Sequence, residues 1–169
     1  MSYTSAASRL VNKDAGPARS VYLVMELRRF PSAPHRGEHP RVLQIRQVSL
    51  LVRDYDPAIA FYVNVLGFEL VEDTDLGDGK RWVRVRASER GAELVLARAA
   101  TDAQRARVGD QSGGRVWLFV ETDDFARDHA RLLAHGVRFL EAPRRERYGT
   151  VAVFEDLYGN KLDLIEPAT

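Results

Sequence analysis

The strongest constraint on this chain is an internal repeat with a period of 70 residues. Displacing the sequence by that length aligns residues of the same kind, among them Asp54 with Asp124, Tyr55 with Phe125, Ala60 with Ala130 and Val83 with Val153. Gly67 meets Gly136 after 69 residues, a slip of one residue inside the predicted helix. A repeat of this length indicates that one supersecondary unit is used twice.

Each copy of the repeat has the pattern of a strand, a helix and three further strands. Hydrophobic periodicity in the first copy predicts strands at 43–52, 68–72, 80–86 and 92–98, with a helix at 56–66. In the second copy it predicts strands at 115–122, 137–140, 150–154 and 161–165, with a helix at 123–135. The predicted fold class is therefore α+β, built from two tandem βαβββ modules.

We expect a single domain at 43–169, with module one at 43–98, a connector at 99–114 and module two at 115–169. The connector has a short helix pattern at 101–108, followed by a Ser-Gly-Gly hinge. It is interpreted as a plain link between the modules. The alternative is a lid over a binding site, with Gln111 facing the ligand.

Residues 1–42 differ in composition from the rest and are predicted to form a flexible N-terminal extension. They are rich in Ser, Ala and Pro, and the segment PSAPHRGEHP cannot hold regular structure. Residues 1–40 carry six Lys or Arg against three Asp or Glu. The alternatives are a targeting or docking arm, and a true start of the protein at Met25.

Composition narrows the class of protein. The whole chain has a net charge of +1 and the basic excess lies in the first 40 residues, so the body offers no face that calls for nucleic acid. No apolar run approaches the roughly 20 residues that cross a bilayer. The absence of cysteine excludes disulfides, thiol nucleophiles and thiolate metal sites. We expect no nucleic-acid or membrane partner and a cytoplasmic location.

The last predicted strand places a carboxylate on an inward face. Asp163 and Ile165 share one face because side chains in a strand alternate. The repeat gives Asp163 a counterpart in Glu93, and it pairs Gln47 on the first strand of module one with Trp117 on the first strand of module two. Four positions thus occupy equivalent places in two copies of one sheet.

These residues lie in segments that make the chain recognisable. The segments are VSLLVRDYDPAIAFYVNVLGFEL at 48–70, TDDFARDHARLLAHGV at 122–137 and FEDLYGNKLDLIEP at 154–167. In this order they resemble the vicinal oxygen chelate superfamily, which contains glyoxalase I, bleomycin-resistance proteins, fosfomycin-resistance enzymes and extradiol dioxygenases. The resemblance covers about 120 residues. It implies that the two modules form a cupped mixed sheet with the helices outside.

The resemblance also implies a metal site. Members that use a metal place one ligand on the first and one on the last strand of each module, which here gives Gln47, Glu93 and Asp163, with Trp117 at the fourth position. An indole has no lone pair to offer, and an Asp is one methylene shorter than the Glu usual in the family. The remaining oxygen ligands would suit a weakly held divalent cation such as Mn²⁺, Mg²⁺ or Ni²⁺.

Alternation along the strands predicts what else faces the cup. The expected substrate-binding residues are Ser49, Trp82, Arg84, Trp117 and Phe119. An apolar, aromatic hollow with a few polar groups is typical of a small-molecule site. The alternative interpretation is that the aromatic residues fill the cup as core and that Arg84 pairs with Glu93 or Asp163.

If the protein is an enzyme, Glu93 is the candidate catalytic residue. A carboxylate beside Trp and Phe is expected to have a raised pKa, which suits proton abstraction next to a carbonyl. Two function classes follow. The first is a glyoxalase-like lyase or isomerase acting on a small oxygenated molecule. The second is a drug- or toxin-binding protein of the bleomycin-resistance type without catalysis. The resemblance further implies a homodimer.

Overall fold

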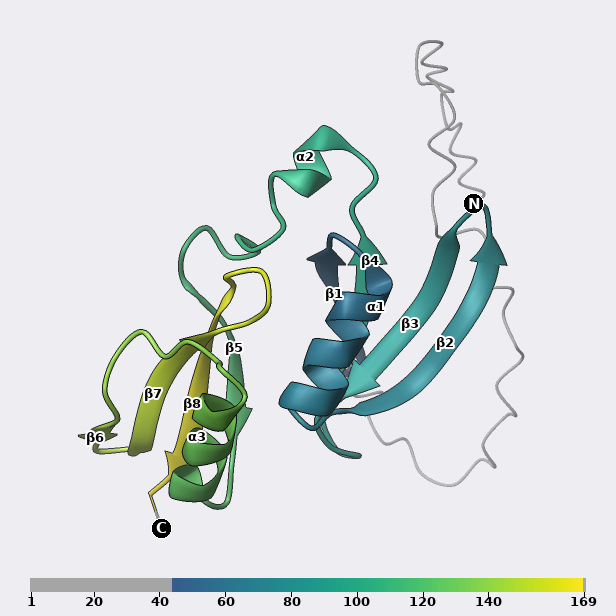
Figure 1. Ribbon diagram of the computed structural model, residues 1–169. Helices are drawn as coiled ribbons and strands as arrows, with labels where there is room; N and C mark the ends of the chain where they lie inside the picture. The colour runs from purple at the N-terminus through teal and green to yellow at the C-terminus, as the bar shows by residue number, and fades with distance from the viewer. Residues whose placement is uncertain (1–43, 169) are drawn as a thin grey trace, which may run out of the picture. The chain divides into compact units, whose positions relative to one another are not determined.

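The computed structural model describes residues 44–168 (Figure 1). The predicted N-terminal extension at 1–42 lies outside the described residues. Module one contains the strands β1 (Gln47–Val52), β2 (Glu69–Gly77), β3 (Lys80–Arg86) and β4 (Glu93–Arg98). Module two contains the strands β5 (Val116–Glu121), β6 (Arg144–Glu146), β7 (Gly149–Glu155) and β8 (Lys161–Pro167). In the described part of the chain, no helix is long and apolar enough to span a membrane.

The two sheets have the same topology. Their strand orders are β1-β4-β3-β2 and β5-β8-β7-β6. In each, the first strand lies parallel to the last, and the other pairings are antiparallel. A parallel pair needs a long crossover, and here it consists of a helix and two further strands. The predicted fold class of two βαβββ modules is confirmed.

Two predicted strands differ from the observed ones. β2 extends to Gly77, beyond the predicted end at residue 72, because it pairs along almost the whole of β3. The segment at 137–140 makes only one isolated bridge, between Phe139 and Phe154, and the strand that pairs with β7 is β6. Phe139 packs its ring on His129 and Phe154 instead. Two backbone hydrogen bonds to β7, from Leu140 N–H to the Val153 carbonyl and from Glu155 N–H to the Arg138 carbonyl, hold this segment together with that ring packing.

The helical segments of the two modules lie within two residues of the predicted bounds, but the first one changes type along its length. Asp54 caps α1 (Tyr55–Ile59) and Asp124 caps α3 (Phe125–Ala134) through their side chains. α1 continues as a π-helix, η2 (Ala60–Val65), in which the Leu66 N–H donates to the Phe61 carbonyl at 3.0 Å. A π turn accommodates one residue more than an α turn. This accounts for the one-residue slip of the repeat inside the helix.

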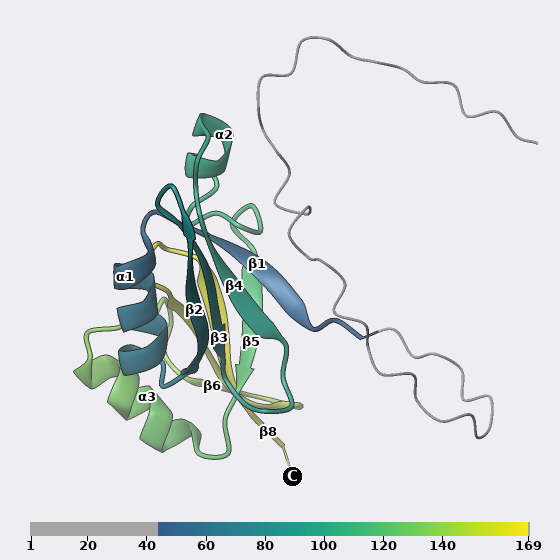
Figure 2. The same ribbon diagram turned by 90° about the vertical axis from the view of Figure 1, so that its right-hand side faces the viewer.

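Both helices lie on the same side of the two sheets in Figure 2. One hydrophobic cluster joins the helices to the sheet faces beneath them, and it includes Leu50, Val83, Leu96, Leu132, Phe154, Leu162 and Leu164. The even-numbered residues of β1, β4 and β8 supply this core, so the odd-numbered residues lie on the opposite faces. Those opposite faces carry the predicted site residues.

A buried carboxylate joins the two modules. The Asp156 side chain, only 6% exposed, accepts from the Tyr62 hydroxyl at 2.8 Å and from the Asn160 amide at 2.8 Å. Its second oxygen accepts from the backbone N–H groups of Tyr158 and Asn160. Tyr62 belongs to η2 and the other residues to the β7–β8 turn, so the network fixes module two against the helix of module one.

We expect Tyr62→Phe to lower the free energy of unfolding by about 1–3 kcal/mol, because it removes a buried donor from a carboxylate. Tyr158→Phe is the matched control, since its hydroxyl donates to the Asp54 carbonyl at an exposed position. Urea unfolding followed by circular dichroism measures both. Equal losses in the two variants would contradict the role given to the buried network.

Candidate functional site

The open face of sheet one holds a chain of hydrogen-bonded polar residues. Gln47 and Glu93 are register partners on β1 and β4, and the Gln47 amide donates to Glu93 Oε2 at 3.1 Å. The same oxygen accepts from the Arg84 guanidinium at 2.5 Å, and Arg84 also pairs with Glu72 at 2.6 Å. The sequence pattern missed Glu72, because a register shift in β2 between Leu70 and Glu72 interrupts the alternation there.

The prediction that the pKa of Glu93 is raised is wrong. The hydrogen bond from Gln47 is the main cause that holds the pKa of Glu93 below its ordinary value, and Arg84 acts in the same direction against the effect of burial. The alternative in which Arg84 pairs with Glu93 describes the observed contact. The aromatic neighbours expected to desolvate Glu93 are replaced by a cation and an amide, and both favour the charged carboxylate.

On the open face of sheet two, the candidate acid lies among apolar side chains and has no ion-pair partner comparable to Arg84 among the described residues. Asp163 is 7% exposed and its Oδ1 is buried without a hydrogen-bond partner. Its register partners on the two flanking strands are Phe119 on β5 and Val153 on β7, which offer no polar side chain. Burial raises the pKa of Asp163 above its ordinary value, and the charge of Arg144 opposes this.

Trp117 does not lie opposite Asp163 as the repeat predicted. The pairing of β5 with β8 passes from Val116–Lys161 directly to Leu118–Leu162, so Trp117 is the extra residue of a β-bulge. The ladder begins one residue out of the predicted register, because Val116 and not Arg115 faces Lys161, and the bulge adds a second step that brings Phe119 beside Asp163. Trp117 is half-buried and packs against the hydrophobic core. A single inserted residue cannot be read from alternation alone.

The predicted site residues fall into two groups. Sheet one carries Gln47, Ser49, Trp82, Arg84 and Glu93; sheet two carries Trp117, Phe119 and Asp163. Ser49 is exposed and Trp82 is half-buried, whereas Phe119 is 66% exposed. Register brings residues together within each group. The two groups belong to different sheets, with no strand pairing between them.

This arrangement does not fit a divalent metal within one chain. The described residues contain no group of three or more His, Cys, Asp and Glu side chains that could hold a metal ion. Glu93 has Arg84 as its counter-ion, so a cation already lies where the metal was expected. Asp163, the third expected ligand, is on the other sheet among apolar neighbours. We derive no chemistry through a metal.

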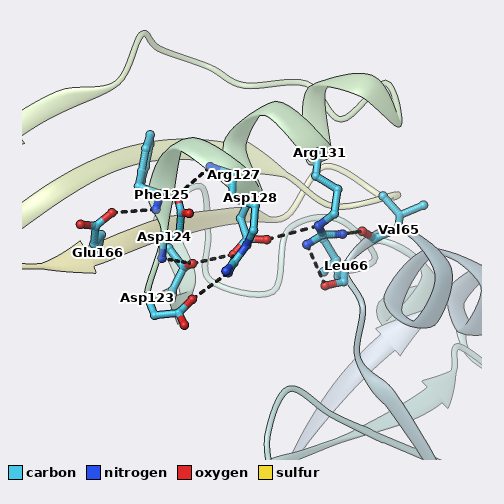
Figure 3. A network of polar contacts seen from close by, with 10 residues as sticks. Val65, Leu66, Asp123, Asp124, Phe125, Arg127, Asp128, Arg131 and Glu166 are labelled. Carbon is cyan, nitrogen blue, oxygen red and sulfur yellow. Dashed lines mark hydrogen bonds and ion pairs between the residues drawn. The ribbon is translucent and has the colours of Figure 1, made fainter.

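A hollow of about 440 Å³ lies between the end of η2 and the β5 and α3 side of module two. Three of its polar lining side chains, Thr122, Asp128 and Arg131, already bond to protein groups, as Figure 3 shows in part. Thr122 donates to Asp128 at 2.5 Å, and Arg131 reaches Asp128 at 3.2 Å and the Val65 carbonyl at 2.5 Å. Because these donors are used, the hollow is better explained as part of the joint between the modules than as a ligand site.

The connector is fastened at Gln111, and this residue does not face an open site. Leu51 N–H donates to the Gln111 side chain at 3.3 Å, and the Gln111 backbone N–H donates to the Asn160 side chain at 3.1 Å. The short helix of the connector is α2 (Asp102–Arg105), and the Thr101 side chain caps it. These contacts favour a structural link over a lid.

The joint between the modules makes stability depend on pH. Arg127 is the main cause that lowers the pKa of Asp128 to about 2, with Thr122 and Arg131 acting in the same direction. In the unfolded chain this carboxyl titrates near 3.8, so its contribution is complete above about pH 5 and is lost as the pH falls from about 4 to 2.

We therefore expect Asp128→Asn to cost on the order of 1–2 kcal/mol of unfolding free energy at pH 7 and much less at pH 2.5. Asp123→Asn is the control, because Asp123 pairs with the same Arg127 but is 86% exposed. Urea titrations at several pH values measure the difference. A difference between wild type and Asp128→Asn that does not change with pH would refute the assignment.

Comparison with known proteins agrees with this fold. The sequence profile of the Glyoxalase/Bleomycin resistance protein/Dioxygenase superfamily matches residues 44–164. An uncharacterized protein of Shewanella frigidimarina (strain NCIMB 400) is 51% identical over 124 residues, which cover 72% of this chain and 92% of that protein.

Solved structures give the same result. UcmS2 is 29% identical with a TM-score of 0.64, over 73% of this chain and 98% of that chain. TnmS3, described as an antibiotic binding protein from Streptomyces sp. CB03234, is 30% identical with a TM-score of 0.62, over 77% of this chain and all of the other. The profile match spans both sheets and the connector, and the chain therefore belongs to the Glyoxalase/Bleomycin resistance protein/Dioxygenase superfamily.

Proposed function

We propose that this protein binds a small organic molecule on the open sheet faces without transforming it, as a drug- or toxin-binding protein does. The observation that carries the proposal is the state of Glu93. A general base works best when its pKa lies near the operating pH, and the contacts with Gln47 and Arg84 move the pKa of Glu93 in the other direction. The description of TnmS3 as an antibiotic binding protein supports the same reading.

A glyoxalase-like lyase or isomerase is the second candidate. It is favoured by the contact between Gln47 and Glu93, which the family resemblance names as ligands on neighbouring strands. In this alternative Glu93 abstracts the proton, and it first has to lose its ion pair with Arg84. The two candidates differ in whether Glu93 is needed for turnover or only for the arrangement of the face.

The two tryptophans provide a direct readout of binding, because Trp82 lies on sheet one and Trp117 on sheet two. We expect quenching of their fluorescence by at least one member of a panel of aromatic antibiotics at micromolar concentration. We expect no isomerisation of the hemithioacetal of methylglyoxal and glutathione. Binding by no member of the panel, together with turnover, would overturn the proposal in favour of the enzyme.

Glu93→Gln tests the same point on one residue. Because Glu93 is not a base in this proposal, we expect the variant to change ligand affinity by less than about tenfold, and no catalytic activity to disappear. Glu69→Gln is the matched control, since Glu69 also pairs with an arginine of β3, Arg86, at 2.8 Å. A turnover that Glu93→Gln abolishes and Glu69→Gln preserves would establish the catalytic role.

The proposal includes a second copy of the chain. β1 and β5 each end their sheet, so each presents an unpaired edge in one chain. The two groups of candidate residues lie on separate sheets, and a partner that aligns module one of one copy with module two of the other would join them into one site. The cytoplasm stays the proposed location.

We expect light scattering after size-exclusion chromatography to give about twice the mass of the 169-residue chain at 50 micromolar protein. The physical reason is that pairing of edge strands would satisfy the unpaired backbone groups of both edges. Measurement at a hundredfold dilution, with and without ligand, serves as the control. A single-chain mass under all of these conditions would rule out the homodimer.

A further inference from the structure

We propose that Asp163 and Phe119 form a subsite for an organic cation, a protonated amine carried on an apolar or aromatic body. The inference rests on the proposed small-molecule function and names the class of ligand that this function takes. Its two components are register partners on neighbouring strands, Phe119 on β5 and Asp163 on β8. One supplies an exposed ring and the other a buried acid.

Asp163 is unlike the other buried polar residues of the described chain. Asp156 and Asn160, which are buried to a similar extent, have partners for their side chains within the protein. Among residues 44–168, the Oδ1 of Asp163 is the buried side-chain oxygen or nitrogen without a hydrogen-bond partner. An unpartnered buried carboxylate costs stability, so it is expected where a ligand supplies the missing partner.

Residues 44–168 supply no dedicated counter-ion to Asp163. The charge that acts on it is that of Arg144, and this guanidinium forms ion pairs with Glu141 and Glu146. The partner of Asp163 is therefore expected to be a positively charged group that comes from outside the chain. Sheet one has no comparable carboxylate, because Glu93, Glu72 and Glu69 are each paired with an arginine.

The surroundings favour an organic cation over a metal ion. A hard divalent ion needs several oxygen ligands, and the register neighbours of Asp163 are the side chains of Phe119 and Val153. On the same face Val151 is fully buried and Ile165 is half-buried. The ammonium group of such a ligand would pair with the carboxylate of Asp163. The ring of Phe119 would contact either the ammonium group, as a cation–π interaction, or the apolar part of the ligand.

A matched pair of probes tests the charge requirement. We choose 2-naphthylmethylamine, which is cationic at pH 7.5, and 2-naphthalenemethanol, which has the same ring and no charge. Fluorescence titration of the full-length protein should show at least tenfold tighter binding of the amine. If the alcohol binds as well as the amine, the protein still binds small molecules and the proposed cation subsite is wrong. Binding of neither probe also overturns the subsite, and the antibiotic panel then decides the broader function.

Two variants test whether Asp163 causes the preference for the amine and whether Phe119 contributes to binding. Asp163→Asn keeps the size of the side chain and removes the charge, so it should abolish the preference for the amine. Phe119→Leu should weaken both probes by at least threefold. Asp123→Asn removes an exposed acid of the same module that pairs with Arg127 and not with Arg144, and it should leave the preference unchanged. A preference for the amine that persists in Asp163→Asn would refute the proposal.

Thermal unfolding separates this role from a structural one. Because Asp163 Oδ1 has no hydrogen-bond partner among residues 44–168, Asp163→Asn should melt at the same temperature as wild type or higher. The amine should raise the melting temperature of wild type and not that of the variant. A melting temperature several degrees below wild type would show that Asp163 supports the fold, and would count against a ligand role.

Discussion

The hydrogen bonds of Asp156 are the interaction on which the arrangement of the two modules depends. Burying a carboxylate is costly unless its oxygens find donors, and here four donors converge on it. Three of them come from its own turn, at Tyr158 and Asn160, and the fourth is the hydroxyl of Tyr62. The network is therefore complete only when η2 of module one lies against the β7–β8 turn of module two.

The π-helical turn explains how module one supplies that fourth donor. Tyr62 aligns with Leu132 in the repeat, so a tyrosine in one copy takes the place of a core leucine in the other. η2 holds one residue more than the corresponding part of α3 before the glycine that ends each helix. Arg131 adds a second link when it donates to the Val65 carbonyl at 2.5 Å. The inserted residue and these contacts make two copies of one unit into unequal halves.

The two modules also differ in the chemistry of their open sheet faces. Glu93 and Asp163 occupy equivalent positions on β4 and β8, yet their pKa values move in opposite directions. Glu93 has a cation and an amide beside it, whereas Asp163 lies between Phe119 and Val153. One carboxylate is satisfied by the protein and the other is left for a ligand. A shared fold thus gives two chemically different surfaces.

From the sequence alone, local periodicity and the repeat predicted the two βαβββ modules and the equivalent positions of Glu93 and Asp163, because both follow from the order of residues along the chain. Tertiary structure alone decided that Arg84 would neutralise Glu93, since that pairing depends on which residues meet across strands β3 and β4. It also decided that the register of β5 against β8, together with a bulge at Trp117, would place Phe119 and not Trp117 beside Asp163. Alternation identifies a face, but strand register and burial set the charge state of the groups on it.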